Sequence, residues 1–194
     1  MEWARENVDH DWDNVVFSDE SSFWAWTLIK RAWSVRGSPV IERIKHPIEV
    51  HVWVHFNVQG FCIFTDNLNA QKMLKLYQRG LLVSVKRWFH GTRDQWVLQE
   101  DNDPKHRSRL CTEWKARNGI NVFDWSPDAN PIENVWSFIK HKLRGKRILK
   151  LKTLVRSIRK ISRSLPVAYA ETLVESMHRR CQAILDNGDD WTYY

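Results

Sequence analysis

The chain has 194 residues, so one domain with a substantial core is expected, since folding at this size hides roughly 70% of the unfolded chain's surface. Apolar residues make up 43% and charged residues 27%, a composition that excludes a wholly disordered chain, and no run approaches the ~20 apolar residues of a membrane span. The formal net charge of +7 favours an anionic partner, nucleic acid first.

The first third of the chain is predicted to be rich in strands. The segment 49–56 alternates strictly, which places Val50, Val52, Val54 and Phe56 on one face of a strand. Its neighbours are short apolar runs separated by turn residues. In chain order, we predict a polar lead-in over 1–14, a short buried strand over 15–17 that ends at Ser18, strands over 23–26 and 32–35, a turn at 37–39, the strand over 49–56, a turn at 59–60 and a strand over 61–64.

The rest of the chain alternates helices with short strands. Gly119 is a stop signal for the helix before it, and Pro131 suits the first turn of the helix after it. The predicted helices cover 69–85, 108–118, 131–144, a basic stretch around 151–161 and 167–186, and the predicted strands cover 96–99 and 120–123. Strands first, then alternating elements, then helices describe a mixed α/β domain.

The positive charge lies in one segment. Between Lys140 and Arg163 there are 24 residues with 11 Lys or Arg and no Asp or Glu, so the remaining 170 residues carry a net charge of −4. The apolar residues from Leu151 to Ile161 recur at helical spacing, and the basic side chains mostly fall off that stripe. A solvated face usually mixes both signs, because like charges one turn apart repel. We therefore favour contact with phosphates over mere solvation. The residues expected to make it are Lys140, Arg144, Lys152, Arg156, Arg159, Lys160 and Arg163.

The 12 tryptophans allow two interpretations. Exposed tryptophans can stack on bases. Tryptophans scattered along a chain more often pack a core, and we favour the core.

Three carboxylates stand at positions where sites form. Asp19 and Asp101 each follow a short predicted strand, and strand ends are where sites collect in α/β sheets. Glu133 lies on the first turn of a predicted helix. Together they could hold two Mg²⁺ ions ~4 Å apart, an arrangement that stabilises the attacking and leaving oxygens of a phosphodiester displacement. The alternatives are ordinary loop positions for both aspartates and a capping box between Asn130 and Glu133.

Three longer motifs surround these carboxylates. Residues 17–21 read Phe-Ser-Asp-Glu-Ser, residues 101–106 read Asp-Asn-Asp-Pro-Lys-His, and residues 126–136 read Ser-Pro-Asp-Ala-Asn-Pro-Ile-Glu-Asn-Val-Trp. In this order they resemble the catalytic domain of Tc1/mariner transposases, Tc1-like branch, over nearly the whole chain. The resemblance implies an RNase H-like α/β fold, with a mixed central sheet flanked by helices, and a catalytic, metal-binding triad of Asp19, Asp101 and Glu133 with two Mg²⁺ or Mn²⁺ ions.

The resemblance also implies partners and a location. The expected partner is DNA, namely transposon ends and a TA target, with a homodimer of the chain and a nuclear location. Lys105 and His106 would face phosphates or would support the triad residues through direct contacts. The expected organisation is a lead-in over 1–14, a DDE catalytic domain over 15–145, and the basic helix with a final helix packed on it over 146–194.

The sequence departs from the family's pattern at three places. The family carries N-terminal helix-turn-helix modules, whereas this chain starts almost at the catalytic domain. A short piece before the Glu133 helix is missing, since Trp125 joins Ser126 directly, and Val54 stands where the family usually has Gly. A displacement of 1 Å can cost ~100-fold in rate. Two alternatives therefore stay open: a non-catalytic, transposase-derived DNA-binding or interaction protein, and an RNase H-like nuclease without a transposon substrate.

Overall fold

The computed structural model describes most of the chain, in six stretches. The predicted strand over 32–35, the turn at 37–39, the motif residues 126–129 and the Trp125–Ser126 junction lie outside them. The described residues are 2–25, 48–65, 69–90, 96–123, 130–146 and 148–187.

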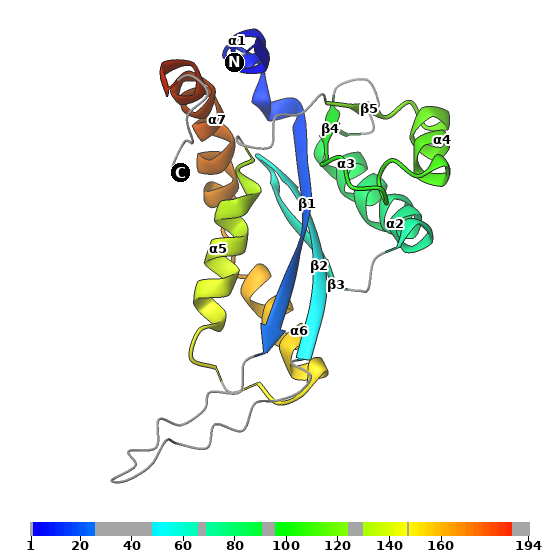
Figure 1. Ribbon diagram of the computed structural model, residues 1–194, viewed down its shortest axis with the longest axis vertical. Coiled ribbons are helices and arrows are strands. Elements are labelled where there is room, and N and C mark those ends of the chain that lie inside the picture. Colours follow the sequence, from blue (N-terminus) through cyan, green and yellow to red (C-terminus); the bar gives the residue numbers. More distant parts are fainter. Residues whose placement is uncertain are drawn as a thin grey trace.

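Five strands form one mixed sheet in the order β3-β2-β1-β4-β5. The strands β1 (Val15–Ala25), β2 (Ile48–Asn57) and β3 (Gly60–Thr65) are antiparallel neighbours. The strands β4 (Val97–Gln99) and β5 (Asn121–Val122) continue the sheet in parallel with β1. As the third of the five strands, β1 is the central strand of the sheet, with an antiparallel neighbour on one side and a parallel neighbour on the other (Figure 1).

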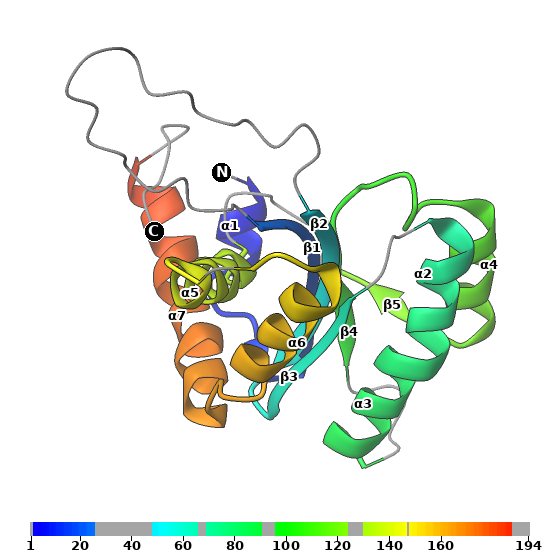
Figure 2. The same cartoon turned by 90° about the horizontal axis from the view of Figure 1, so that it is seen from below.

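Helices cover both faces of this sheet (Figure 2). One face carries α5 (Ile132–Leu143), α6 (Leu151–Ser162) and α7 (Val167–Asn187), with α1 (Glu2–Asn7) beside α7. The other face carries the second group, which is α2 (Ala70–Leu76), a π-helical turn over Tyr77–Leu81, α3 (Leu82–Trp88) and α4 (Arg109–Arg117). No helix in the described parts is long and apolar enough to cross a membrane.

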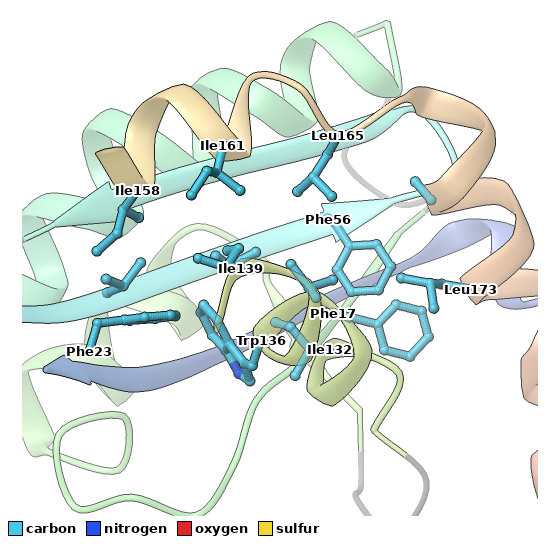
Figure 3. Packing of buried hydrophobic residues seen from close by; sticks show 14 of the residues in the cluster. Phe17, Phe23, Phe56, Ile132, Trp136, Ile139, Ile158, Ile161, Leu165 and Leu173 are labelled. Carbon is cyan, nitrogen blue, oxygen red and sulfur yellow. The ribbon is translucent and has the colours of Figure 1, made fainter. Parts of the chain in front are cut away.

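The alternation of β2 decides which residues enter which core. Its even-numbered apolar residues pack in the cluster under α5, α6 and α7, while Trp53 belongs to the separate cluster on the opposite face. Val54 is fully buried in the first cluster. Figure 3 shows how that cluster is filled from the sheet and from the helices on this face, with Phe17 and Phe56 from the sheet, Trp136 from α5, Ile158 from α6 and Leu173 from α7.

The predicted end of the first strand is wrong. The strand β1 continues for 11 residues to Ala25, through the polar stretch 18–22 that resembles a loop in sequence. The reason is pairing: β2 lies against β1 at every position from Phe17 to Ala25, so the polar residues keep extended backbone with satisfied hydrogen bonds. Asp19 therefore lies within a strand, opposite Val54.

The predicted strand over 23–26 is the end of β1 and not a separate element, and the other predicted elements that lie within the described residues are confirmed with small shifts. The side chains of Asn69 and Ser108 cap α2 and α4 by accepting from backbone N–H groups, as expected of helix-starting residues. Gly119, at φ +64°, follows α4 in the left-handed region that glycine favours. Pro131 precedes α5 directly. Trp12, Trp53 and Trp136 are almost completely buried, so the core interpretation holds for them.

Candidate functional site

The register of the parallel strands aligns Asp19 with Asp101. The pairing of β1 with β4 ends at Phe17 opposite Gln99, and each aspartate lies two residues further along its own chain segment. Asp19 continues in β1, whereas Asp101 has left the sheet. The two carboxylates thus come from the same level of neighbouring parallel segments, where an α/β sheet forms its sites.

Asp19 is held against α5. Because side chains alternate along a strand, Asp19 shares the face of Phe17 and Phe23. The indole N–H of Trp136 donates to its carboxylate oxygen Oδ2 at 3.0 Å. This hydrogen bond links the central strand to the helix that carries Glu133.

The pKa of the Asp19 carboxyl is raised to about 7, first because burial removes water from the charged form, and then because the carboxylates of Glu20 and Asp101 lie near. The hydrogen bonds from Trp136 and from the backbone N–H of Glu20 act in the opposite direction. Asp19 is therefore a carboxylate whose negative charge is poorly compensated by the protein itself.

Glu133 is exposed on the first turn of α5, three residues before Trp136. Residues at this spacing lie about 5–6 Å apart at Cβ on one side of a helix. The predicted capping box does not form: the Asn130 side chain accepts from the N–H of Ile132 at 3.1 Å, and the N–H of Glu133 donates to the backbone carbonyl of Asn130. Within the described stretches, the Glu133 carboxylate has no hydrogen bond or ion pair, so it is available for another partner.

A buried network of polar groups lies behind Asp101. The Nε2 of His106 is 3.0 Å from Glu20 Oε1 and 3.4 Å from Asp101 Oδ1. On its other side, His106 Nδ1 is 2.5 Å from the hydroxyl of Tyr77, and that hydroxyl donates to Glu100 Oε2 at 2.7 Å. Both ring nitrogens of His106 therefore face groups that accept a hydrogen bond, which favours the charged imidazolium.

The electrostatics of His106 agree with this geometry. Burial lowers the pKa of His106, but its hydrogen bond with Glu20 and the surrounding carboxylate charges outweigh burial, and the pKa is raised overall. The ammonium of Lys115, from α4, completes the network through an ion pair with Glu100 and a 3.2 Å hydrogen bond to the carbonyl of His106. The loop that carries Asp101 is thus fixed to β1, to the Tyr77 helix and to α4.

Within the described part of the chain, one group of three side chains offers possible metal-ligand atoms that all lie within 4.8 Å of one another: Glu20, Asp101 and His106. Asp19 and Glu133 are not members of this group. The convergence of Asp19, Asp101 and Glu133 on one metal pair stays a prediction.

The predicted phosphate contacts divide into two sets. His106 is completely buried, so direct contact between its imidazole and DNA does not fit this structure. The Lys105 ammonium is paired with Asp103. The other set is exposed on α5, on α6 or next to these helices: Lys140, Arg144, Lys152, Arg156, Arg159, Lys160 and Arg163.

Sequence reasoning did not find Glu20, Tyr77, Glu100 or Lys115 as parts of the site. Tyr77 is one of the apolar positions of the predicted helix over 69–85, and no sequence motif includes Lys115. The available signals were two Glu residues directly beside the candidate aspartates, in the pairs Asp19-Glu20 and Glu100-Asp101.

Replacing Trp136 with phenylalanine is expected to raise the pKa of Asp19 above 7. The smaller ring keeps an aromatic group in the core but removes the N–H that favours the charged carboxylate. The measurement is an NMR pH titration of the Asp19 carboxyl carbon in EDTA. The control is Trp12→Phe, since Trp12 is equally buried and its N–H has no acceptor in the described residues. An unchanged pKa in Trp136→Phe would contradict the assignment.

Comparison with known proteins assigns the chain to a family. The model of the DDE superfamily endonucleases matches residues 14–155, a range that includes Asp19, Asp101 and Glu133. The Tcb1 transposase of Caenorhabditis briggsae is 30% identical over 201 residues, which cover 96% of this chain and 73% of that protein. The Tc1 transposase of Caenorhabditis elegans is 27% identical over 206 residues, covering 100% of this chain and 74% of that protein.

Solved structures give the same fold. The Mos1 mariner paired end complex with Mn superposes with a TM-score of 0.78 at 14% identity, and the match covers 97% of this chain but 60% of the Mos1 chain. The Mos1 catalytic domain alone superposes with a TM-score of 0.71 at 14% identity, and 89% of that domain is covered. The expected RNase H-like fold is confirmed. The chain thus belongs to the DDE superfamily endonucleases and corresponds there to the catalytic domain of the Tc1/mariner transposases.

Proposed function

We propose that this chain cuts and joins DNA as a transposase: it hydrolyses phosphodiester bonds at transposon ends, and the freed 3′-hydroxyl then attacks a phosphodiester at a TA target, where the target's own 3′-oxygen leaves. The observation that carries the proposal is the alignment of Asp19 and Asp101 on neighbouring parallel segments, beside a helix that brings Glu133 and is tied to Asp19 through Trp136. Membership of the family supports the same reaction class.

Asp19, Asp101 and Glu133 are proposed to bind two Mg²⁺ or Mn²⁺ ions. Carboxylate oxygens are the ligands that these ions prefer, and the raised pKa of Asp19 shows a negative charge that lacks compensation in the protein. When bound, such ions would stabilise the charge that develops on the attacking and leaving oxygens. Trp136 fixes the orientation of Asp19, and His106 does the same for Asp101.

The DNA is proposed to lie along the exposed basic face of α6 and the last turn of α5. This face carries Lys140, Arg144, Lys152, Arg156, Arg159, Lys160 and Arg163, and phosphate neutralisation by Lys and Arg supplies most non-specific affinity for DNA. We further propose that two copies of the chain act together on transposon ends, and that they do so in the nucleus.

The test is nicking of supercoiled plasmid by the full chain with Mg²⁺ or Mn²⁺, with EDTA as the metal-free arm. Asp19→Asn, Asp101→Asn and Glu133→Gln should each lower the rate by at least about 10³-fold, because each removes several kcal/mol of charge stabilisation. The matched control is Glu171→Gln, an exposed glutamate on α7.

Two outcomes would contradict the proposed function. Nicking that survives both Asp19→Asn and Asp101→Asn would place the chemistry elsewhere. Salt-dependent DNA binding without any metal-dependent nicking would favour the alternative of a non-catalytic, transposase-derived DNA-binding protein.

A further inference from the structure

The first turn of α5 carries Glu133, and its local support is weak. Pro131, at the N-cap position, contributes no side-chain hydrogen bond. The N–H of Glu133 reaches the carbonyl of Asn130 at 3.5 Å, which is long for a hydrogen bond. The first N–H groups of a helix have no acceptor within the helix, so such a turn frays easily. The position of the Glu133 carboxylate therefore depends on what holds this turn from outside.

Two side chains of α7 hold this turn. The helix α7 lies beside α5 (Figure 1 and Figure 2). The guanidinium of Arg180 donates from Nη2 to the side-chain oxygen of Asn134 at 2.9 Å, and the hydroxyl of Tyr169 donates to the backbone carbonyl of Asn134 at 3.3 Å. The two donors lie about three helical turns apart on α7. They converge on the residue that directly follows Glu133.

Arg180 is itself fixed within α7. Its side chain is buried, with 5% exposed, and its Nε donates to the hydroxyl of Ser176 at 2.9 Å, one turn earlier on the same helix. A planar guanidinium that donates in two directions has little freedom to rotate. Arg180 is thus a rigid connection between α7 and the first turn of α5, whereas its neighbour Arg179 is exposed.

The electrostatics of Arg180 favour a role in geometry. The first turn of a helix is the positive end of the helix dipole, so a cation beside it is unfavourable. Burial of a guanidinium also removes its hydration. A methionine of similar length would fill the same space without either cost. These costs favour a role in holding the turn over a role in stability alone.

We propose that Arg180 is a positioning residue for the reaction: through Asn134 it fixes the first turn of α5 and so holds the Glu133 carboxylate where it binds a divalent cation. One turn later, α5 is tied to Asp19 through Trp136, so contacts from α7 and from β1 fix consecutive turns of the same helix. Contacts of this kind are typically worth 10- to 100-fold in metal affinity. The inference rests on the proposed function, in which Glu133 is a metal ligand.

The test is a titration of the full chain with Mn²⁺ in the absence of DNA, followed by the electron paramagnetic resonance signal of free Mn²⁺. Arg180→Met should weaken Mn²⁺ binding by at least about tenfold. Arg180→Lys should recover part of the affinity, because an ammonium can still donate to Asn134. The matched control is Arg179→Met, the exposed neighbour, which should bind Mn²⁺ like the unsubstituted chain.

A double-mutant cycle separates positioning from a general structural effect. If Arg180 acts through Glu133, Arg180→Met should cause no further loss of Mn²⁺ affinity in a Glu133→Gln chain. An effect on folding would weaken binding equally in both backgrounds. Asn134→Ala removes the same contact from the half-buried side of α5 and should reproduce the loss, also where Arg180→Met does not fold.

Hydrogen exchange tests the contact itself without metal. In Arg180→Met, the amides of 130–137 should exchange about fivefold faster, the local opening expected from the loss of one net hydrogen bond. The amides of 138–143 should be unaffected, and Arg179→Met should match the unsubstituted chain throughout.

Three results would overturn the inference: unchanged Mn²⁺ affinity in Arg180→Met, an equal loss with and without Glu133→Gln, or unchanged exchange over 130–137. The plasmid assay keeps this inference apart from the proposed function. Mn²⁺ binding that depends on Arg180 through Glu133, in a chain that does not nick plasmid, would contradict the proposed function alone.

Discussion

Replacement of Lys115 by methionine is expected to lower the free energy of unfolding by about 3–5 kcal/mol, the range seen when one partner of a buried ion pair is removed. Lys115 is 6% exposed and pairs with Glu100, which is also buried. Methionine has similar length and fills the space, so the loss comes from the charge on the buried Glu100, which then keeps only His106, 3.5 Å away, as a cationic neighbour. Chemical denaturation at pH 7 measures the change.

Two further variants make this prediction specific. Arg117→Met removes a cation from the same helix, but the Arg117 side chain is 73% exposed in its pair with Glu113, so the expected loss is below about 1 kcal/mol. The double variant Lys115→Met with Glu100→Gln should recover much of the stability, because a neutral amide oxygen still accepts from Tyr77. A single variant as stable as the unsubstituted chain would show that the pair is not buried in solution.

Most of the fold was predictable because local patterns agree with tertiary contacts. The alternation of β2 matches its burial, with Val50, Val52, Val54 and Phe56 all in one cluster. The apolar stripe of α6 is confirmed from Leu154 onward, since Leu154, Ile158 and Ile161 are buried, whereas Leu151 at its start is exposed. In these elements the spacing of the apolar residues along the sequence matches the face that the neighbouring layer buries.

The end of β1 was not predictable for the opposite reason. A polar run such as Ser18–Ser22 favours a loop when only the sequence is considered, and the partner strand that keeps it extended lies more than 25 residues away. The candidate site was likewise predictable only in part. Motifs indicate Asp19, Asp101 and Glu133, but the contacts of Tyr77 and Lys115 with Glu100 join segments that no local pattern relates.

The metal-free chain is expected to lose stability as the pH rises from about 4 to about 7, because of Asp19. The folded chain holds this proton up to a pKa of about 7, whereas the unfolded chain releases it near the ordinary value of 3.8. Between these values the folded state binds more protons, so raising the pH favours unfolding. The stabilisation is complete below the unfolded pKa and is lost through the folded pKa, with a slope of at most about 1.4 kcal/mol per pH unit.

The variant Asp19→Asn isolates this contribution from those of other titrating groups, among them His106, whose raised pKa also favours the folded state at low pH. In EDTA, the stability of the unsubstituted chain should fall between pH 5 and pH 8 relative to Asp19→Asn, whereas Asp9→Asn, at an exposed position, should follow the unsubstituted chain. Adding Mn²⁺ at pH 8 should stabilise the unsubstituted chain and not Asp19→Asn, because a cation bound only to the folded state takes the place of the proton. Parallel pH profiles for the unsubstituted chain and Asp19→Asn would show that Asp19 is already ionised at low pH. Its environment would then need no cation, and the strongest electrostatic reason for a metal at this carboxylate would be lost.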